Sequence, residues 1–236
     1  KKFGDFTAND HINLTVHKGE VHAILGENGA GKSTMMNVLC GLYKPTSGQI
    51  FINEKEVHFN SPKDAIDMGI GMVHQHFMLI QPFTVTENII LGMEPTKGLT
   101  IDKETAKKKV LELSERYGMK VDPDAKVEDI SVGMQQRVEI LKALYRGAEI
   151  LILDDSASAL DYATDAALRK ALAALPGSLT VFIVSQRAAS LQHADQILVL
   201  DDGRLVGLGT HDQLRQSCPV YEEIYESQFK KGDVQK

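Results

Sequence analysis

The stretch Gly26-Glu27-Asn28-Gly29-Ala30-Gly31-Lys32-Ser33 follows the apolar run Val21–Leu25 and leads into a helix-like segment at residues 33–42. Its spacing matches the pattern G-x-x-x-x-G-K-S/T, which forms a phosphate-binding loop between a buried strand and a helix. Glycines let backbone N–H groups wrap around phosphate oxygens, and the helix start adds the positive end of its dipole. We expect Lys32 to reach the outer phosphates and the Ser33 hydroxyl to bind Mg²⁺. The stretch therefore predicts a phosphate site where a strand of an α/β fold ends.

A carboxylate suited to the same metal ion follows a second apolar run. Residues 150–153 are all aliphatic, and Asp154 comes directly after them. An aspartate at the end of a buried strand can anchor Mg²⁺ and its water beside a phosphate loop. Such an aspartate is common alone and becomes a strong signal only together with residues 26–33.

Strands alternate with helices along the rest of the chain, which implies a mainly parallel sheet. Residues 50–53 and 56–59 instead predict a small antiparallel hairpin that turns at Glu54-Lys55. Further strands are expected at residues 150–153, 180–184, 196–200 and 204–208, with a helix at about 162–175.

A helical pattern interrupts this alternation between about residues 80 and 147. Asp102 is suited to cap one helix that Gly118 ends, and a second helix ends near Gly147. The patterns therefore divide a single domain, residues 1–236, into a core of residues 1–79 and 148–236 and an inserted helical subdomain of residues 80–147.

Composition narrows the classes of partner. Of the 236 residues 43% are hydrophobic and 25% are charged, with a net charge of −6, as in an ordinary globular protein. The acidic balance argues against a nucleic-acid partner, which would favour a basic surface. No apolar run approaches ~18 residues, so the chain is not expected to span a membrane. Two cysteines are too few for a disulfide framework, and a reduced cytosolic setting fits them.

The chain's family resemblance rests on six motifs, which in chain order are Phe3, residues 26–33, Gln75, residues 130–135, Asp154 and residues 158–161. Ser131-Val132-Gly133-Met134-Gln135, with Ile130 before it, is similar to the L-S-G-G-Q signature of ABC-transporter ATPases, although Val132 and Met134 depart from it. Gln75 fits the Q-loop of that family, and Ser158-Ala159-Leu160-Asp161 fits the D-loop. The resemblance covers essentially the whole chain. It implies an α/β, P-loop NTPase (RecA-like) core with a mainly parallel sheet, a small antiparallel β subdomain and an inserted helical subdomain.

The resemblance also implies ATP and Mg²⁺ as ligands. Phe3 would stack on the adenine, and Ser33, Gln75 and Asp154 would hold the metal ion. In the family, the signature serine and glycine bind the γ-phosphate held by an opposite subunit, and Ser131 and Gly133 keep those roles. The full set implied to contact ATP is Phe3, Gly26, Glu27, Asn28, Gly29, Ala30, Gly31, Lys32, Ser33, Thr34, Ser131, Gly133, Gln135 and Asp161.

Two positions depart from the family's hydrolytic residues. A glutamate that polarises the attacking water and a histidine that contacts the γ-phosphate are replaced by Asp155 and Gln186, which with Gln75 are the catalytic candidates. Asp155 is one methylene shorter, and a misplacement of about 1 Å can cost on the order of 10²-fold. Gln186 can donate a hydrogen bond but cannot carry a positive charge. We therefore expect MgATP binding with slow hydrolysis; the alternative is that both changes are neutral.

The two parts of the chain resemble different branches of the family. Residues 1 to about 148 resemble sugar and nucleoside importer ATPases, whereas residues from about 150 resemble the degenerate half of heterodimeric exporters. This predicts a recombined or engineered chimera with a junction near residues 145–151. The alternative is a natural divergent member.

Three functions follow from the resemblance. The first is an ATPase domain that works in a head-to-tail dimer with a second ATPase domain, at the cytoplasmic, inner face of a membrane. It would drive a transmembrane transporter subunit, whose coupling helix would meet Phe77, Leu79 and Phe83. The second is a degenerate regulatory module that holds ATP while a partner hydrolyses it. The third is a chimera without a physiological task.

Overall fold

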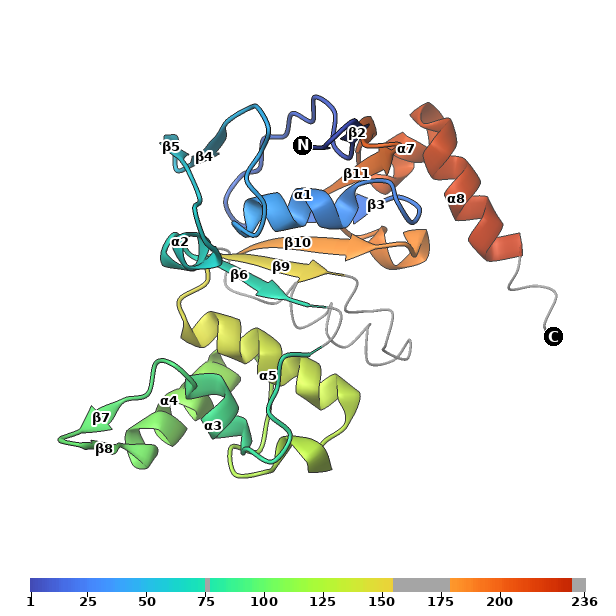
Figure 1. The fold of residues 1–236 in the computed structure, drawn as a ribbon. Coiled ribbons are helices and arrows are strands. Elements are labelled where there is room, and N and C mark those ends of the chain that lie inside the picture. Colours follow the sequence, from blue (N-terminus) through green and yellow to red (C-terminus); the bar gives the residue numbers. More distant parts are fainter. Residues whose placement is uncertain (75–76, 155–178, 231–236) are drawn as a thin grey trace.

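The computed structural model describes residues 1–74, 77–154 and 179–230, drawn in colour in Figure 1. Its centre is a six-stranded sheet in the order β12-β11-β3-β10-β9-β6. Five strands run parallel, and β12 pairs antiparallel with β11. The strands are β3 (Val21–Leu25), β6 (Ile70–Val73), β9 (Ile150–Asp154), β10 (Thr180–Ser185), β11 (Gln196–Asp201) and β12 (Arg204–Gly209). The α/β fold with a mainly parallel sheet is therefore confirmed.

Both faces of the five parallel strands are buried, so these strands are mostly apolar instead of alternating with polar residues. The antiparallel edge strand β12 alternates between exposed and less exposed residues. In β3, Ala23 and Leu25 belong to one hydrophobic cluster, and Ile24 between them belongs to the other. Neighbouring strands repeat this division because successive side chains point to opposite faces. Ile152 of β9 lies in the cluster of Ile24, whereas Leu151 lies in that of Leu25.

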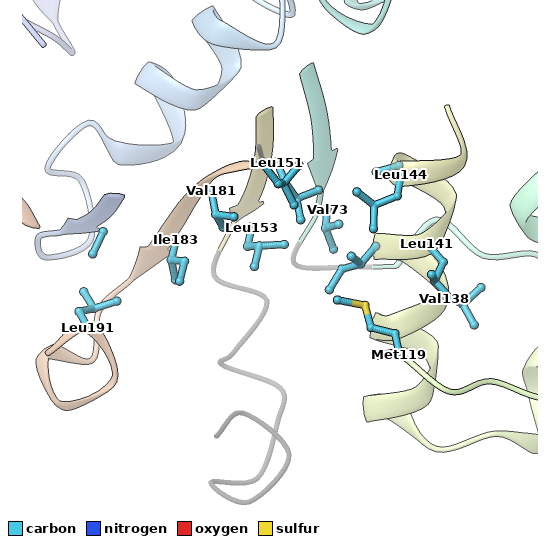
Figure 2. Close-up of a cluster of buried hydrophobic side chains, with 14 of the residues drawn as sticks. Val73, Met119, Val138, Leu141, Leu144, Leu151, Leu153, Val181, Ile183 and Leu191 are labelled. Carbon is cyan, nitrogen blue, oxygen red and sulfur yellow. The ribbon is translucent and has the colours of Figure 1, made fainter. Parts of the chain in front are cut away.

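Helices cover the two faces differently (Figure 1). Helix α1 (Lys32–Leu39) packs Met35 and Met36 against the face that holds Ile24. Helix α5 (Val132–Tyr145) packs against the opposite face, where its Val138 and Leu141 share a cluster with strand residues such as Leu153 (Figure 2). Helices α1 and α5 therefore lie on opposite sides of the sheet.

Helix α5 joins the sheet to a group of helices, and α3 and α4 lie on the side of α5 away from the sheet (Figure 1). Asp102 caps α4 as expected, since its carboxylate accepts a hydrogen bond from the Thr105 N–H at 3.0 Å. An unexpected hairpin of β7 (Thr96–Lys97) and β8 (Thr100–Ile101) precedes α4. The helices of this group are α3 (Val85–Ile90), α4 (Lys103–Arg116), the 3₁₀ turn η1 (Val127–Asp129) and α5.

Small elements complete the described chain. The predicted hairpin is confirmed, but its turn is Asn53-Glu54 and not Glu54-Lys55, with Ile52 paired to Lys55. Both turn residues have positive φ, 50° and 65°, as a two-residue hairpin turn of type I′ requires. The small elements are β1 (Lys2–Phe3), β2 (Phe6–Thr7), β4 (Ile50–Ile52), β5 (Lys55–Val57), α2 (Pro62–Asp67), the 3₁₀ turn η2 (Ala188–Leu191), α7 (His211–Ser217) and α8 (Pro219–Lys230).

Several further predictions from the sequence can be compared with the residues that the structure describes. Helix α1 starts one residue earlier than expected and ends at Leu39, before Gly41 with its φ of 72°. Cys40 and Cys218 are buried free thiols. Within the described ranges, no helix is long and apolar enough to cross a membrane. The helix expected at about 162–175 lies outside those ranges.

Candidate functional site

Three strands end together at one edge of the sheet. In the parallel register, Ser185 of β10 lies opposite Leu25 of β3, and Val184 lies opposite Asp154 of β9. The phosphate loop follows Leu25 directly, and Gln186 follows Ser185. The fold therefore brings the loop, Asp154 and Gln186 to the same edge, where open α/β sheets bind their ligands.

Glycines shape the phosphate loop in two ways. Gly29 and Gly31 have positive φ, 89° and 93°, which side chains rarely adopt. A Cβ at Gly31 would lie 2.3 Å from the Ala8 carbonyl oxygen, and one at Gly26 would lie 2.4 Å from that of Leu200. The loop is thus wedged between the N-terminal segment and β11, and its path needs glycine for both conformation and space.

Lys32 lies folded across the base of the loop. Its buried ammonium donates hydrogen bonds to the carbonyl oxygens of Gly26 at 2.7 Å and Glu27 at 2.8 Å. These contacts hold a positive charge at the start of α1, where the helix dipole also favours an anion. Ser33 beside it is exposed, and Thr34 is half-buried.

Gln186 reaches the rim of the loop. Its amide Nε2 donates to the Asn28 side-chain oxygen at 2.9 Å, which joins the end of β10 to the loop.

Asp154 is half-buried. Burial, and secondarily the Asp154 carboxylate, raises the pKa of Cys40 to about 12, so that thiol stays protonated near neutral pH.

The end of β6 leads to the same edge of the sheet. Val73 of β6 pairs with Leu153, so the chain leaves β6 at the edge that carries Asp154. Gln75, Asp155 and Asp161 all lie outside the described residues.

Phe3 belongs to an exposed aromatic pair. Its ring meets that of Tyr43 edge to face at 5.4 Å, and the Lys1 ammonium lies 4.9 Å from its ring centre. Phe3 itself is 44% exposed, so its ring is accessible for stacking. Tyr43 was not among the predicted residues because no spacing rule links it to Phe3, which lies far from it in the sequence.

Asn9 is a second residue that the sequence did not indicate. Its amide donates to the Gly31 carbonyl at 3.0 Å, so it buttresses the loop from the N-terminal segment. A lone asparagine in a loop carries no recognisable signal; only the fold places it against Gly31.

The signature residues lie apart from the phosphate loop. Ser131 is the N-cap of α5, and its hydroxyl accepts from the Met134 N–H at 3.4 Å. Gly133 is in the first turn, and the Gln135 amide donates to the carbonyls of Val127 and Ile130. Since α5 and α1 cover opposite faces of the sheet, the described chain does not bring this motif to its own phosphate loop.

A cavity of ≈ 260 Å³ lies between α2, β6 and α5. Its lining is largely apolar, with Met72, Met78 and Ala143 among the lining residues. Glu139 also lines it, is 7% exposed, and its Oε1 has no hydrogen-bond partner within the described chain. Burial lowers the pKa of the neighbouring Lys142, whose ammonium donates to the Met78 carbonyl at 3.2 Å.

Proteins of a known family are similar to this chain in sequence. The family model described as ABC transporter matches residues 9–158. The nucleoside import ATP-binding protein NupA of Lactococcus lactis subsp. cremoris is 54% identical over 208 residues, which cover 87% of this chain and 41% of that protein. The guanosine import ATP-binding protein NupO of Bacillus subtilis is 61% identical over 160 residues, 68% of this chain and 31% of that protein. The chain thus spans about two fifths or less of the length of these relatives.

Solved structures share the fold. An ATP-binding cassette of an ABC transporter in its ADP conformation has a TM-score of 0.83 at 25% identity, over 95% of this chain and 94% of that one. A bacterial Atm1-family ABC exporter with ATP bound has a TM-score of 0.72 at 27% identity, over 89% of this chain and 37% of that one.

The comparisons give no support to a chimera. The NupA match covers 87% of the chain, so it extends beyond residue 148 into the part that resembles exporters. The importer likeness therefore does not stop at the expected junction.

Proposed function

The chain belongs to the ABC transporter ATP-binding family, and on this premise we propose that it is the domain of an importer that binds MgATP at residues 26–34. The observation that carries the proposal is the common sheet edge, where the phosphate loop, Asp154 and Gln186 come together. The names of NupA and NupO favour nucleosides as the transported class.

The residues at this edge fit a triphosphate and its metal ion. Gly29 has positive φ and open space beside it, so the backbone there can lie against a phosphate. Lys32 holds a positive charge at the helix start. Ser33, Gln75 and Asp154 offer oxygen donors, which Mg²⁺ prefers, and bound Mg²⁺ would neutralise charge on the phosphates. The exposed ring of Phe3 would stack on the base.

Hydrolysis is proposed to be slow. Asp155 would orient the attacking water from one methylene further back than a glutamate would, and Gln75 would help to place that water. Gln186 already donates its amide hydrogen to Asn28 in the loop, so it is well placed to donate to a phosphate oxygen. Its amide cannot carry the positive charge of a protonated histidine.

Binding of MgATP to the purified chain is the direct test. Lys32→Ala should weaken binding by roughly 10- to 100-fold, because one hydrogen bond between charged partners is lost. Titration calorimetry would measure this, with circular dichroism as the check on folding. Lys103→Ala, at an exposed lysine in α4, is the matched control. Equal affinity in wild type and Lys32→Ala would contradict the proposed site.

A second ATPase domain is the first proposed partner. Ser131, Gly133 and Gln135 stand at the start of α5, on the other side of the sheet from α1. In a head-to-tail dimer, each chain would present this motif to its partner's phosphate loop, and Asp161 would lie near the interface.

A transmembrane transporter subunit is the second proposed partner. Met78 lines the ≈ 260 Å³ cavity between α2, β6 and α5, and it stands between Phe77 and Leu79 in the sequence, after Gln75. An apolar hollow with a buried carboxylate suits the coupling helix of such a subunit. This partner would place the domain at the cytoplasmic face of the membrane.

Two alternatives remain as hypotheses. A degenerate regulatory subunit is favoured by Gln186 in place of histidine, and an ATPase assay distinguishes it from an active importer domain. A chimera joined near residues 145–151 is tested by aligning each part separately with natural sequences. If one natural protein is the best match for both parts, the chimera hypothesis fails.

A further inference from the structure

Helix α8 contacts the segment that carries Gln186. The Gln228 amide Nε2 donates to the Gln186 carbonyl at 2.6 Å, and its Oε1 accepts from the Ala188 N–H at 2.9 Å. One side chain therefore binds two backbone groups of the three-residue segment 186–188, as a neighbouring strand would. We propose that Gln228 is a positioning residue, which fixes Gln186 relative to the phosphate loop.

A further hydrogen bond connects Gln186 to the phosphate loop. While its carbonyl accepts from Gln228, its side-chain amide donates to Asn28 Oδ1 at 2.9 Å. The segment is also held from within, because the Arg187 N–H donates to Ser185 Oγ at 3.0 Å and Ser185 is buried. A continuous series of hydrogen bonds thus connects α8 to the phosphate loop.

Helix α8 is anchored independently of Gln228. Tyr221 is fully buried two turns earlier, and its hydroxyl bonds His211 Nδ1 at 2.7 Å. Arg215 of α7 pairs with Glu222 through two bonds of 2.8 and 2.9 Å. Since positions i and i+7 share a helix face, the docking of Tyr221 delivers Gln228 to residues 186–188. Removing the Gln228 amide should therefore leave α8 folded and in place.

The proposed role requires both the N–H donor and the oxygen acceptor of the Gln228 side-chain amide. Glutamate has nearly the same shape but is only an acceptor when ionised, so it would keep the Ala188 bond and repel the Gln186 carbonyl. Gln228→Glu and Gln228→Ala should both release Gln186. Ser227→Ala is the matched control, because among the residues that the structure describes the Ser227 hydroxyl donates to the Ile224 carbonyl of its own helix.

The contact is tested in the nucleotide-free chain by NMR. The side-chain amide of Asn28 and the backbone amide of Gly29 should shift in Gln228→Ala and Gln228→Glu, and stay unchanged in Ser227→Ala. The Ala188 amide should shift much less in Gln228→Glu than in Gln228→Ala. Unchanged loop resonances in both Gln228 variants, with the Tyr221 signals intact, would overturn the proposal.

The effect on nucleotide rests on the proposed function and is tested by a double-mutant cycle. The MgATP hydrolysis rate should fall several-fold, towards the ~10²-fold that a misplacement of about 1 Å can cost, in Gln228→Ala. It should not fall further when Gln228→Ala is added to Gln186→Ala, because Gln228 acts through Gln186. Additive losses would show a separate structural effect and overturn the positioning role. If wild type does not bind MgATP, the proposed function fails, while the resonances still test the contact.

Discussion

At the scale of single residues, the rate of ATP hydrolysis is expected to depend on two substitutions. Asp155→Glu with Gln186→His should raise turnover by on the order of 10²-fold or more, because both the water-orienting and the charged group are restored. Steady-state release of phosphate measures it. MgATP affinity should change little, because residues 26–34 are untouched.

The single variants make this prediction sharper. Each should recover only part of the rate, since residues that act as a unit are non-additive. A wild-type chain that already turns over ATP at several per second would contradict the diagnosis.

Gly31 of the phosphate loop is expected to matter for the stability of the fold. Gly31→Ala should destabilise the fold by on the order of 1–3 kcal/mol, because alanine is strained at positive φ. The contact of its Cβ with the Ala8 carbonyl, 2.3 Å away, should add to this loss. Urea unfolding measures the change. Gly118→Ala is the control, since Gly118 has a φ of 63° but no atom within 4 Å of its added Cβ. Equal losses in the two variants would show that close packing at Gly31 is unimportant.

At the scale of elements, the start of α3 is a capping box. The Glu87 N–H donates to Thr84 Oγ1 at 3.1 Å, and the Thr84 N–H donates to the Glu87 carboxylate at 3.0 Å. Thr84→Ala should lower the free energy of unfolding by about 1 kcal/mol, measured by denaturant titration. Thr84→Ser keeps the cap and should behave like wild type.

The same cap predicts a pH dependence. The backbone N–H of Thr84, the largest cause, lowers the pKa of Glu87 from its ordinary value. Folding therefore gains stability above the unfolded pKa, and this gain is lost as the pH falls through the lowered folded pKa. Glu87→Gln should flatten the acid limb of the curve of stability against pH. An unchanged acid limb would exclude Glu87 as a contributor.

Elements were predictable where local patterns are strong. The buried strand Val21–Leu25 and the cap at Asp102 follow from apolar runs and a helix-start residue. The predicted turn of the hairpin of β4 and β5 was wrong by one residue. Asn53 and Glu54 adopt positive φ together, and a glutamate does not indicate that conformation. The hairpin of β7 and β8 was missed because each strand has only two residues.

At the scale of the whole molecule, slow hydrolysis should trap a dimer. With MgATP the chain should sediment as a dimer, because each phosphate loop would meet the partner's Ser131 and Gly133. Gly133→Asp should prevent this, since its carboxylate would repel the partner's γ-phosphate although it suits the helix dipole. Analytical ultracentrifugation measures the state. The Gly133→Asp variant should still bind MgATP at its own phosphate loop. A dimer of this variant with MgATP would exclude the head-to-tail arrangement.

Residue order alone was enough to specify the phosphate loop, Asp154 and the α/β fold. These depend on short-range spacing: glycines where the chain must turn tightly, and a carboxylate after an apolar run. The assembly of the site required the fold, because the pairing of β3, β10 and β9 brings Ser185 level with Leu25 and Val184 level with Asp154. The same is true of Asn9 at Gly31 and Gln228 at Gln186, contacts between residues distant in sequence that no local pattern encodes.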